Sequence, residues 1–181
     1  MLTFNNLKFK IKNFKNSLGQ TLLEVIVVIT VGVIIIGALV FTTISSLRNA
    51  STAKNDAQAT KLAQEGLEKV RAIRDRNGNI SGGGFPADSW ADPDLWSGSL
   101  SANICVAPQG CFFKISFADL NYLGAYQSPP TGGETLGNFT RYIILSDDAN
   151  FADWKEVTAL VTWIDFAGTH ESRMKTILRK L

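Results

Sequence analysis

Residue types that carry chemistry are few and scattered in this chain. Its single histidine, His170, argues against a metal enzyme or a histidine-dependent hydrolase. Asp88, Asp92 and Asp94 offer the oxygen atoms that calcium prefers, but their spacing matches no calcium-binding loop and favours a solvated loop. Ser146-Asp147-Asp148 indicates a loop or a helix cap. We therefore predict no catalytic residue, no metal site, no cofactor and no enzyme activity.

Two cysteines, Cys105 and Cys111, enclose five residues. This spacing is not Cys-x-x-Cys, so it does not indicate redox catalysis. In an oxidising compartment such a pair forms a structural disulfide, whereas two buried free thiols are the alternative in a reducing one. The compartment therefore decides the state of the pair, and we expect a disulfide if this part of the chain lies outside the cytoplasm.

The start of the chain has the layout of a membrane anchor. Residues 1–19 contain four lysines and no acidic residue, and Val25 to Leu47 contains no charge at all. A helix of that length spans about 34 Å, enough to cross a bilayer. Because the basic residues precede the apolar run, the positive-inside rule places 1–19 in the cytoplasm and the residues from Arg48 onward outside. The sequence thus predicts one span in the inner membrane.

Two features at the border of this run are unusual for a simple anchor. Glu24 directly precedes the apolar residues, although a carboxylate at membrane depth costs about 2.5–3.5 kcal/mol on insertion scales. Gly19 lies between the basic segment and the apolar run, where its flexible backbone can present an extended conformation to a protease. A membrane-embedded carboxylate is tolerable when it meets a cation, such as the amino group that cleavage creates.

The stretch 17–29, Ser-Leu-Gly-Gln-Thr-Leu-Leu-Glu-Val-Ile-Val-Val-Ile, resembles the processing site of type IV prepilins and type II secretion pseudopilins. The resemblance implies cleavage between Gly19 and Gln20 by a prepilin peptidase, which also methylates Gln20. It also implies that Glu24 is the glutamate of the mature N-terminal segment that serves assembly. The resemblance further implies that Thr21, Leu22, Leu23 and Glu24 take part in assembly and processing. One departure is Gln20 itself, because the first mature residue of the family is usually phenylalanine.

Helical spacing continues beyond the apolar run. Alanines and larger apolar residues recur every three or four positions as one helix face: Ala50, Ala53, Ala57, Thr60, Ala63, Leu67, Val70 and Ile73. Asn77-Gly78 is a stop signal, so we predict one helix from Leu22 to Arg76. The stretch 62–75 also resembles minor pilins of the pilus-modification type. Gly32 and Gly37 are either points where helical hydrogen bonding loosens or sites of close helix contact.

The remaining residues indicate a small outer domain at 77–181. Residues 77–111, rich in glycine and proline, suggest a long irregular loop, with Trp90 and Trp96 covering the core. Strands are expected at 112–117, 141–145 and 156–163, and the last of them turns at 165–169 into an antiparallel partner at 171–178. We expect an α+β fold, with a long N-terminal helix packed by its outer half on a C-terminal antiparallel sheet.

These observations divide the chain into a leader (1–19), a transmembrane and assembly helix (20–47), an outer helix (48–76) and a globular domain (77–181). The resemblance implies a structural subunit, a minor pilin or pseudopilin, of a type IV pilus-like or type II secretion-like filament. Its partners would be the prepilin peptidase, other pilin subunits and an inner-membrane assembly platform, and its final location an extracytoplasmic filament.

Two alternatives belong to other classes of protein. One is an unprocessed single-pass membrane protein whose outer domain binds a ligand. The other is a DNA-binding tip pilin that uses its basic C-terminal residues: Arg173, Lys175, Arg179 and Lys180. The net charge of +2 and the lack of aromatic residues among these basic ones do not favour nucleic acid.

Overall fold

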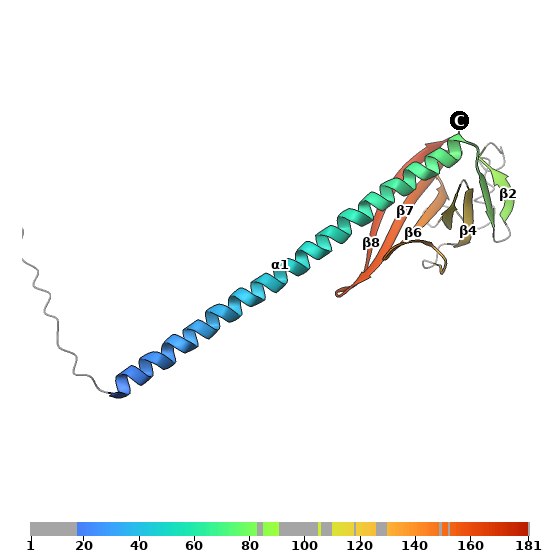
Figure 1. Ribbon diagram of the computed structural model, residues 1–181. Helices are drawn as coiled ribbons and strands as arrows, with labels where there is room; N and C mark the ends of the chain where they lie inside the picture. The colour runs from blue at the N-terminus through green and yellow to red at the C-terminus, as the bar shows by residue number, and fades with distance from the viewer. Residues whose placement is uncertain are drawn as a thin grey trace, which may run out of the picture. The chain divides into compact units, whose positions relative to one another are not determined.

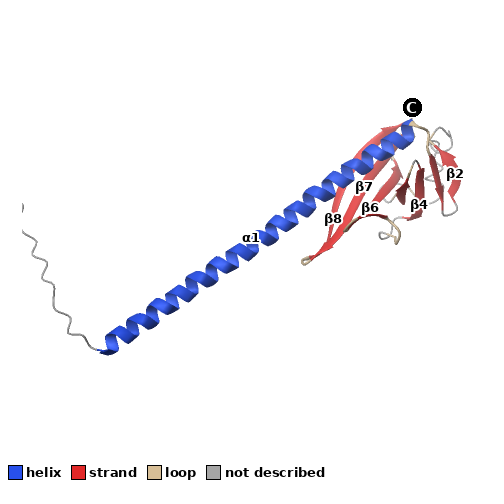
Figure 2. Ribbon diagram, viewed as in Figure 1, coloured by secondary structure: helices blue, strands red, loops and turns tan. Residues whose placement is uncertain are grey.

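A computed structural model of the chain contains one long helix and a sheet (Figures 1 and 2). It describes residues 18–82, 85–90, 105, 110–117, 119–125, 130–148, 150–151 and 153–180, but not the side chains of 18–20, 82, 85–89 and 125. Most of the predicted leader therefore lies outside the described residues, as do Asp92, Asp94 and Trp96. The chain divides into an inner unit, Met1–Ala50, and an outer unit, Ser51–Leu181.

Helix α1 (Leu18–Asp75) confirms the predicted long helix. Its end is built by Asn77, whose φ of 59° is left-handed, and by Gly78. The N–H of Gly78 donates to the carbonyl of Ile73 at 2.8 Å, and the N–H of Asn77 donates to that of Arg74 at 2.9 Å. These two bonds satisfy carbonyls of the last turn that have no partner within the helix. The helix therefore stops where Asn-Gly occurs.

The outer unit contains one mostly antiparallel sheet in the order β2-β1-β4-β3-β6-β7-β8, with β5 beside β6, as far as its residues are described. Strands β1 and β4 are the parallel pair. Strand β8 forms one edge and pairs with β7 along its whole length. The strands are β1 (Asn79–Gly82), β2 (Phe85–Ser89), β3 (Cys111–Ser116), β4 (Asp119–Ala125), β5 (Glu134–Leu136), β6 (Phe139–Asp147), β7 (Trp154–Asp165) and β8 (Gly168–Arg179).

The predicted closing hairpin is confirmed as β7 and β8. Residues Val157, Ala159, Val161 and Trp163 share one buried face of β7, as their alternation indicates. Two other predictions were wrong. The 77–111 region is not irregular throughout, since β1 and β2 lie in it. Ser146 and Asp147 belong to β6, because both pair with β7, so the loop interpretation of 146–148 holds only for Asp148, whose Oδ1 accepts from the N–H of Asn150.

The outer part of α1 packs on the sheet through a narrower stretch than its sequence pattern predicts. Ala59, Ala63, Leu67, Val70 and Ile73 are buried in the same core as the inner face of β7. The predicted face began earlier and included other residues, all of which are exposed: Ala50, Ala53, Ala57 and Thr60. The periodicity of the small residues therefore continues beyond the region that the sheet covers.

Candidate functional site

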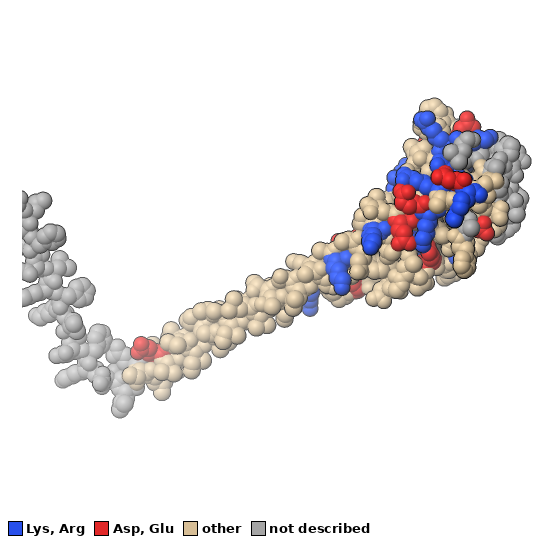
Figure 3. Space-filling model, turned by 45° about the horizontal axis from the view of Figure 1, so that its top comes forward, with Lys and Arg blue, Asp and Glu red and all other residues tan. Residues whose placement is uncertain are grey.

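The inner part of α1 presents an apolar surface on which none of the other described residues packs. The apolar window of the candidate span contains no buried residue, and side chains such as Ile34 and Ile36 are more than three-fifths exposed. Figure 3 shows this stretch as a run of atoms without charge colouring. Apolar surface of this extent requires a cover, either lipid or other helices.

Three threonine hydroxyls within this apolar stretch donate to the backbone of the helix itself. Thr30 donates to the carbonyl of Ile26 at 2.8 Å, and Thr43 donates to that of Leu39 at 2.8 Å. Thr42 likewise donates to the carbonyls of Ala38 and Leu39. Back-bonded threonines expose little polar surface, so they can lie in lipid at small cost.

Residues of the predicted processing site lie at the beginning of α1. Leu18, Gly19 and Gln20 form its first residues, and the side chains of Thr21, Leu22, Leu23 and Glu24 are exposed. Extended backbone at Gly19 would require this first turn to unwind. Glu24 lies about 6 Å along the helix axis from Gln20, at 1.5 Å per residue, so the amino group that cleavage would create is not beside the carboxylate of the same chain.

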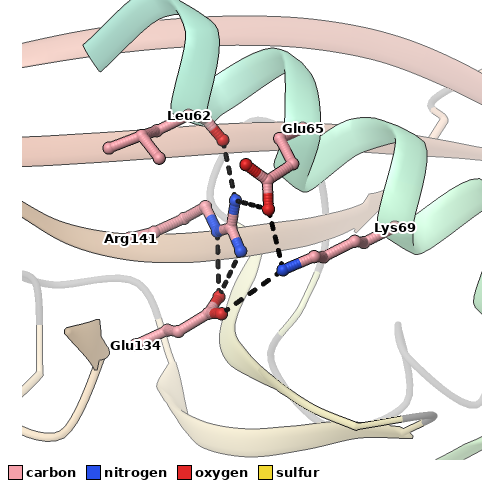
Figure 4. Close-up of polar contacts among 5 residues, drawn as sticks. All are labelled: Leu62, Glu65, Lys69, Glu134 and Arg141. Carbon is pink, nitrogen blue, oxygen red and sulfur yellow. Dashed lines mark hydrogen bonds and ion pairs between the residues drawn. The ribbon is translucent and has the colours of Figure 1, made fainter. Parts of the chain in front are cut away.

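Arg141 of β6 is the centre of an ionic network in the outer unit (Figure 4). Its side chain is fully buried, and two of its nitrogens donate to one Glu134 oxygen, Oε2, at 2.9 and 2.6 Å. Nη1 donates to the carbonyl of Leu62 in α1 at 2.8 Å. Lys69 forms ion pairs with Glu65 at 2.9 Å and with Glu134 at 3.8 Å. The network joins α1 to β5 and β6, so its role is positioning of the helix.

Gly66 gives this arginine its space. A Cβ at position 66 would lie 2.9 Å from Cδ of Arg141, closer than packed carbons approach. Hydrogen bonding from Lys69 also holds the pKa of the Glu65 carboxyl below its ordinary value. From the sequence alone, Arg141 was expected only to begin a strand. An arginine within the apolar stretch of 139–145 was the available signal, because a buried arginine requires acidic partners.

His170 and Asp165 lie beside the turn between β7 and β8. The Nε2 atom of His170 is 2.9 Å from Oδ1 of Asp165, and the imidazole stacks on Trp163 with ring centroids 5.4 Å apart. Burial alone would raise the pKa of the Asp165 carboxyl. Hydrogen bonds from the N–H of Ala167 and from the His170 ring lower it by more, so the net pKa lies below the ordinary value. The half-buried histidine contacts both Asp165 and Trp163 of β7 and so stabilises the hairpin. It lies near the turn, as its position in the sequence predicts.

The predicted disulfide is present, and a metal cluster is not found among the described residues. Cys105 and Cys111 are bonded, with Cα atoms 5.0 Å apart, and both are buried. Trp90 is 4% exposed and covers the core as predicted. Within the described ranges, no group of three or more metal-ligating side chains occurs. A groove of about 590 Å³ lies between α1 and the β5–β6 turn, with Lys54, Lys61 and Asn138 in its lining.

Comparison with known proteins gives no relative: no protein-family model, no curated protein and no solved structure matches this chain. The class of protein is therefore defined by the fold and by the apolar helix. The chain has an α+β outer unit, and its N-terminal helix fits a single-pass membrane protein.

Proposed function

We propose that this chain is a structural subunit, a minor pilin or pseudopilin, of a type IV pilus-like or type II secretion-like filament. The observation that carries the proposal is one arrangement at the start of α1: Gly19, Gln20 and Glu24 lie in its first turns, directly before the long, exposed apolar run of the same helix. A plain anchor needs the apolar helix but has no use for a glutamate at its border. The proposal gives each of these parts a purpose.

Membrane insertion comes first in the proposed sequence of events. The lysines of the leader hold the N-terminus in the cytoplasm, and the apolar helix crosses the inner membrane. The outer unit then lies in an oxidising compartment, a location that the Cys105–Cys111 bond supports. A prepilin peptidase cuts between Gly19 and Gln20 and methylates the new N-terminus at Gln20.

Assembly then uses the exposed helix and Glu24. Apolar side chains of neighbouring helices replace lipid. A Cβ built at Gly32 or Gly37 would meet no described atom within 4 Å beyond the nearby helix backbone, so these positions are open to a neighbour. Cleavage leaves Gln20 with an amino group whose ordinary pKa is near ~8. At about 4 Å and an effective dielectric near 20, its attraction to Glu24 of a neighbour is worth about 4 kcal/mol. This pairing selects one register between neighbouring helices among the many that apolar contacts allow.

The DNA-binding alternative is less well supported, because acidic partners neutralise part of the basic strand β8. Nε of Arg173 is 3.0 Å from Oε1 of Glu171, and Nζ of Lys175 is 2.5 Å from Oε2 of Glu156. Charges paired in this way attract phosphate only weakly. The arrangement instead suits an edge strand that resists unwanted pairing with other strands.

The experiment for this proposal is the incorporation of Glu24→Ala subunits into filaments sheared from cells with an active assembly system. We expect a large loss of incorporation with leader cleavage retained, and partial recovery with Glu24→Asp, which keeps the charge. Glu68→Ala is the matched control, since Glu68 is an exposed glutamate of the same helix outside the apolar run. Unchanged incorporation of Glu24→Ala would reject the register-setting role.

A further inference from the structure

The turn between β7 and β8 exposes large apolar side chains. Ile164 is 76% exposed and Phe166 is 64% exposed. Both lie at the tip of the hairpin, where Asp165 pairs with Gly168 and small or polar residues suffice to make the turn. Isolated exposed apolar residues are ordinary on protein surfaces, so what matters here is where in the outer unit this tip lies.

Contacts within the outer unit give the level of the tip along α1. Arg141 donates to the carbonyl of Leu62, and the sheet register places Arg141 level with Ser172 of β8, through Val161 of β7. From Ser172 to the turn β8 covers about 14–20 Å at 3.4 Å per residue. The same distance along α1, measured from Leu62 towards the N-terminus at about 1.5 Å per residue, ends close to Ser51.

Figure 1 agrees with this estimate, since the hairpin of β7 and β8 runs back along the outer part of α1, away from its C-terminal end. The tip therefore lies at the end of the outer unit where that unit begins, at Ser51. Ser51 follows Leu47, the last residue of the uncharged run, by four residues. Even a fully extended chain of that length reaches only about 14 Å, so this end of the outer unit is tethered beside the bilayer.

We propose that, while the chain is anchored in the membrane, the β7–β8 turn rests on the lipid surface with Ile164 and Phe166 at the headgroup boundary. Aromatic and aliphatic side chains prefer this boundary. Lys54, three residues after Ser51, lies at the same end of the outer unit, and its charge complements anionic headgroups. The proposal rests on membrane anchoring alone and holds whether or not the chain enters a filament.

The contact gives the outer unit two attachments to the membrane, the helix and the hairpin tip. Two attachments restrict how the unit tilts about its tether at Ser51. A subunit drawn out of the bilayer must release the tip as well as the helix. The tip is therefore a surface that lipid covers before extraction and that becomes available afterwards.

A depth measurement on the full-length chain in vesicles of phosphatidylethanolamine and phosphatidylglycerol tests this contact. Both native cysteines are consumed by the disulfide, so Phe166→Cys introduces a single thiol for the fluorophore NBD. Phe151→Cys is the matched control. Phe151 is also an exposed phenylalanine, at 51%, but it stacks on Trp154, which pairs with Arg179 at the opposite end of β8.

Quenching by a nitroxide lipid labelled at the headgroup should be about threefold stronger at position 166 than at 151, with blue-shifted emission at 166 alone. Thermal unfolding of both labelled chains, compared with the unlabelled protein, checks that neither substitution disturbs the fold. Equal weak quenching at the two positions would overturn the proposal, because the tip would then be in water. Equal strong quenching would overturn it too, because the outer unit would then lie on lipid without preference.

Discussion

Arg141 joins α1 to the sheet through the carbonyl of Leu62 and the carboxylate of Glu65. Its guanidinium is fully buried, while its partner Glu134 is 20% exposed on the side chain. A buried charge that loses its partner costs far more than an exposed pair contributes. Loss of one partner alone is therefore expected to be costly, whereas replacement of both partners by apolar residues can be nearly neutral.

Substitution Arg141→Ala should lower the free energy of unfolding by about 3–5 kcal/mol, because it leaves Glu134 without its main partner. Urea unfolding in detergent, followed by near-ultraviolet circular dichroism, measures the change. Glu171→Ala removes an exposed partner of Arg173 and should stay within about 0.5 kcal/mol. Similar effects of the two substitutions would contradict the assigned role of Arg141.

Asp165 makes the stability of the hairpin sensitive to acid. Its pKa in the folded state is lowered, so the unfolded chain takes up the proton first as the pH falls. The stabilisation is present above the ordinary carboxyl pKa, about 4, and is lost as the pH falls through the lower folded value. Asp165→Asn should flatten this part of the profile of unfolding free energy against pH. A variant profile parallel to that of the wild type would show that Asp165 contributes nothing there.

Helix α1 is a single element with two kinds of surface, one unpartnered and apolar and one packed on the sheet. The boundary between them can be tested with two alanines of the same helix. Ala63 is fully buried, whereas Ala57 is exposed. Ala63→Leu should destabilise by about 1–3 kcal/mol through overpacking, and Ala57→Leu should change stability by less than about 0.5 kcal/mol. A destabilising Ala57→Leu would mean that the sheet covers more of α1 than described.

The disulfide joins Cys111, the first residue of β3, to Cys105, six positions earlier in the sequence. A loop of this size contributes about 2 kcal/mol on the chain-entropy account. The double variant Cys105→Ser/Cys111→Ser should therefore lose about that amount of unfolding free energy, with the helical signal retained. Addition of reductant should move the wild type to the same stability and leave the variant unchanged. A wild type indifferent to reductant would contradict this contribution.

Sequence reasoning predicted the elements whose signals are local. Each of these signals is made by residues that are close together in the sequence. Examples are the Asn77-Gly78 stop, the apolar run and the alternation of Val157 to Trp163. The short strands β1, β2, β4 and β5 were missed, because they depend on pairing with distant strands more than on their own pattern. Arg141 was missed as a network centre for the same reason, since Leu62 and Glu65 are brought to it only by the packing of α1 on the sheet.

Taken as a whole, the molecule combines a membrane-type helix with an α+β outer unit. In the proposed function this subunit is assembled into a filament, and assembly depends on what happens at the N-terminus. A processed subunit has an amino group at Gln20 to offer to Glu24 of a neighbour, whereas an unprocessed anchor retains the basic leader and has none.

The most direct measurement is the intact mass and N-terminal sequence of the native protein from cells in which filament assembly is active. The account predicts a chain that begins at Gln20, carries one N-methyl group and lacks residues 1–19. A Gly19→Val variant should accumulate with its leader attached, because a branched side chain restricts the backbone at the cut, whereas Gly32→Val should be processed normally. A native chain that still begins at Met1 under these conditions would contradict the central claim.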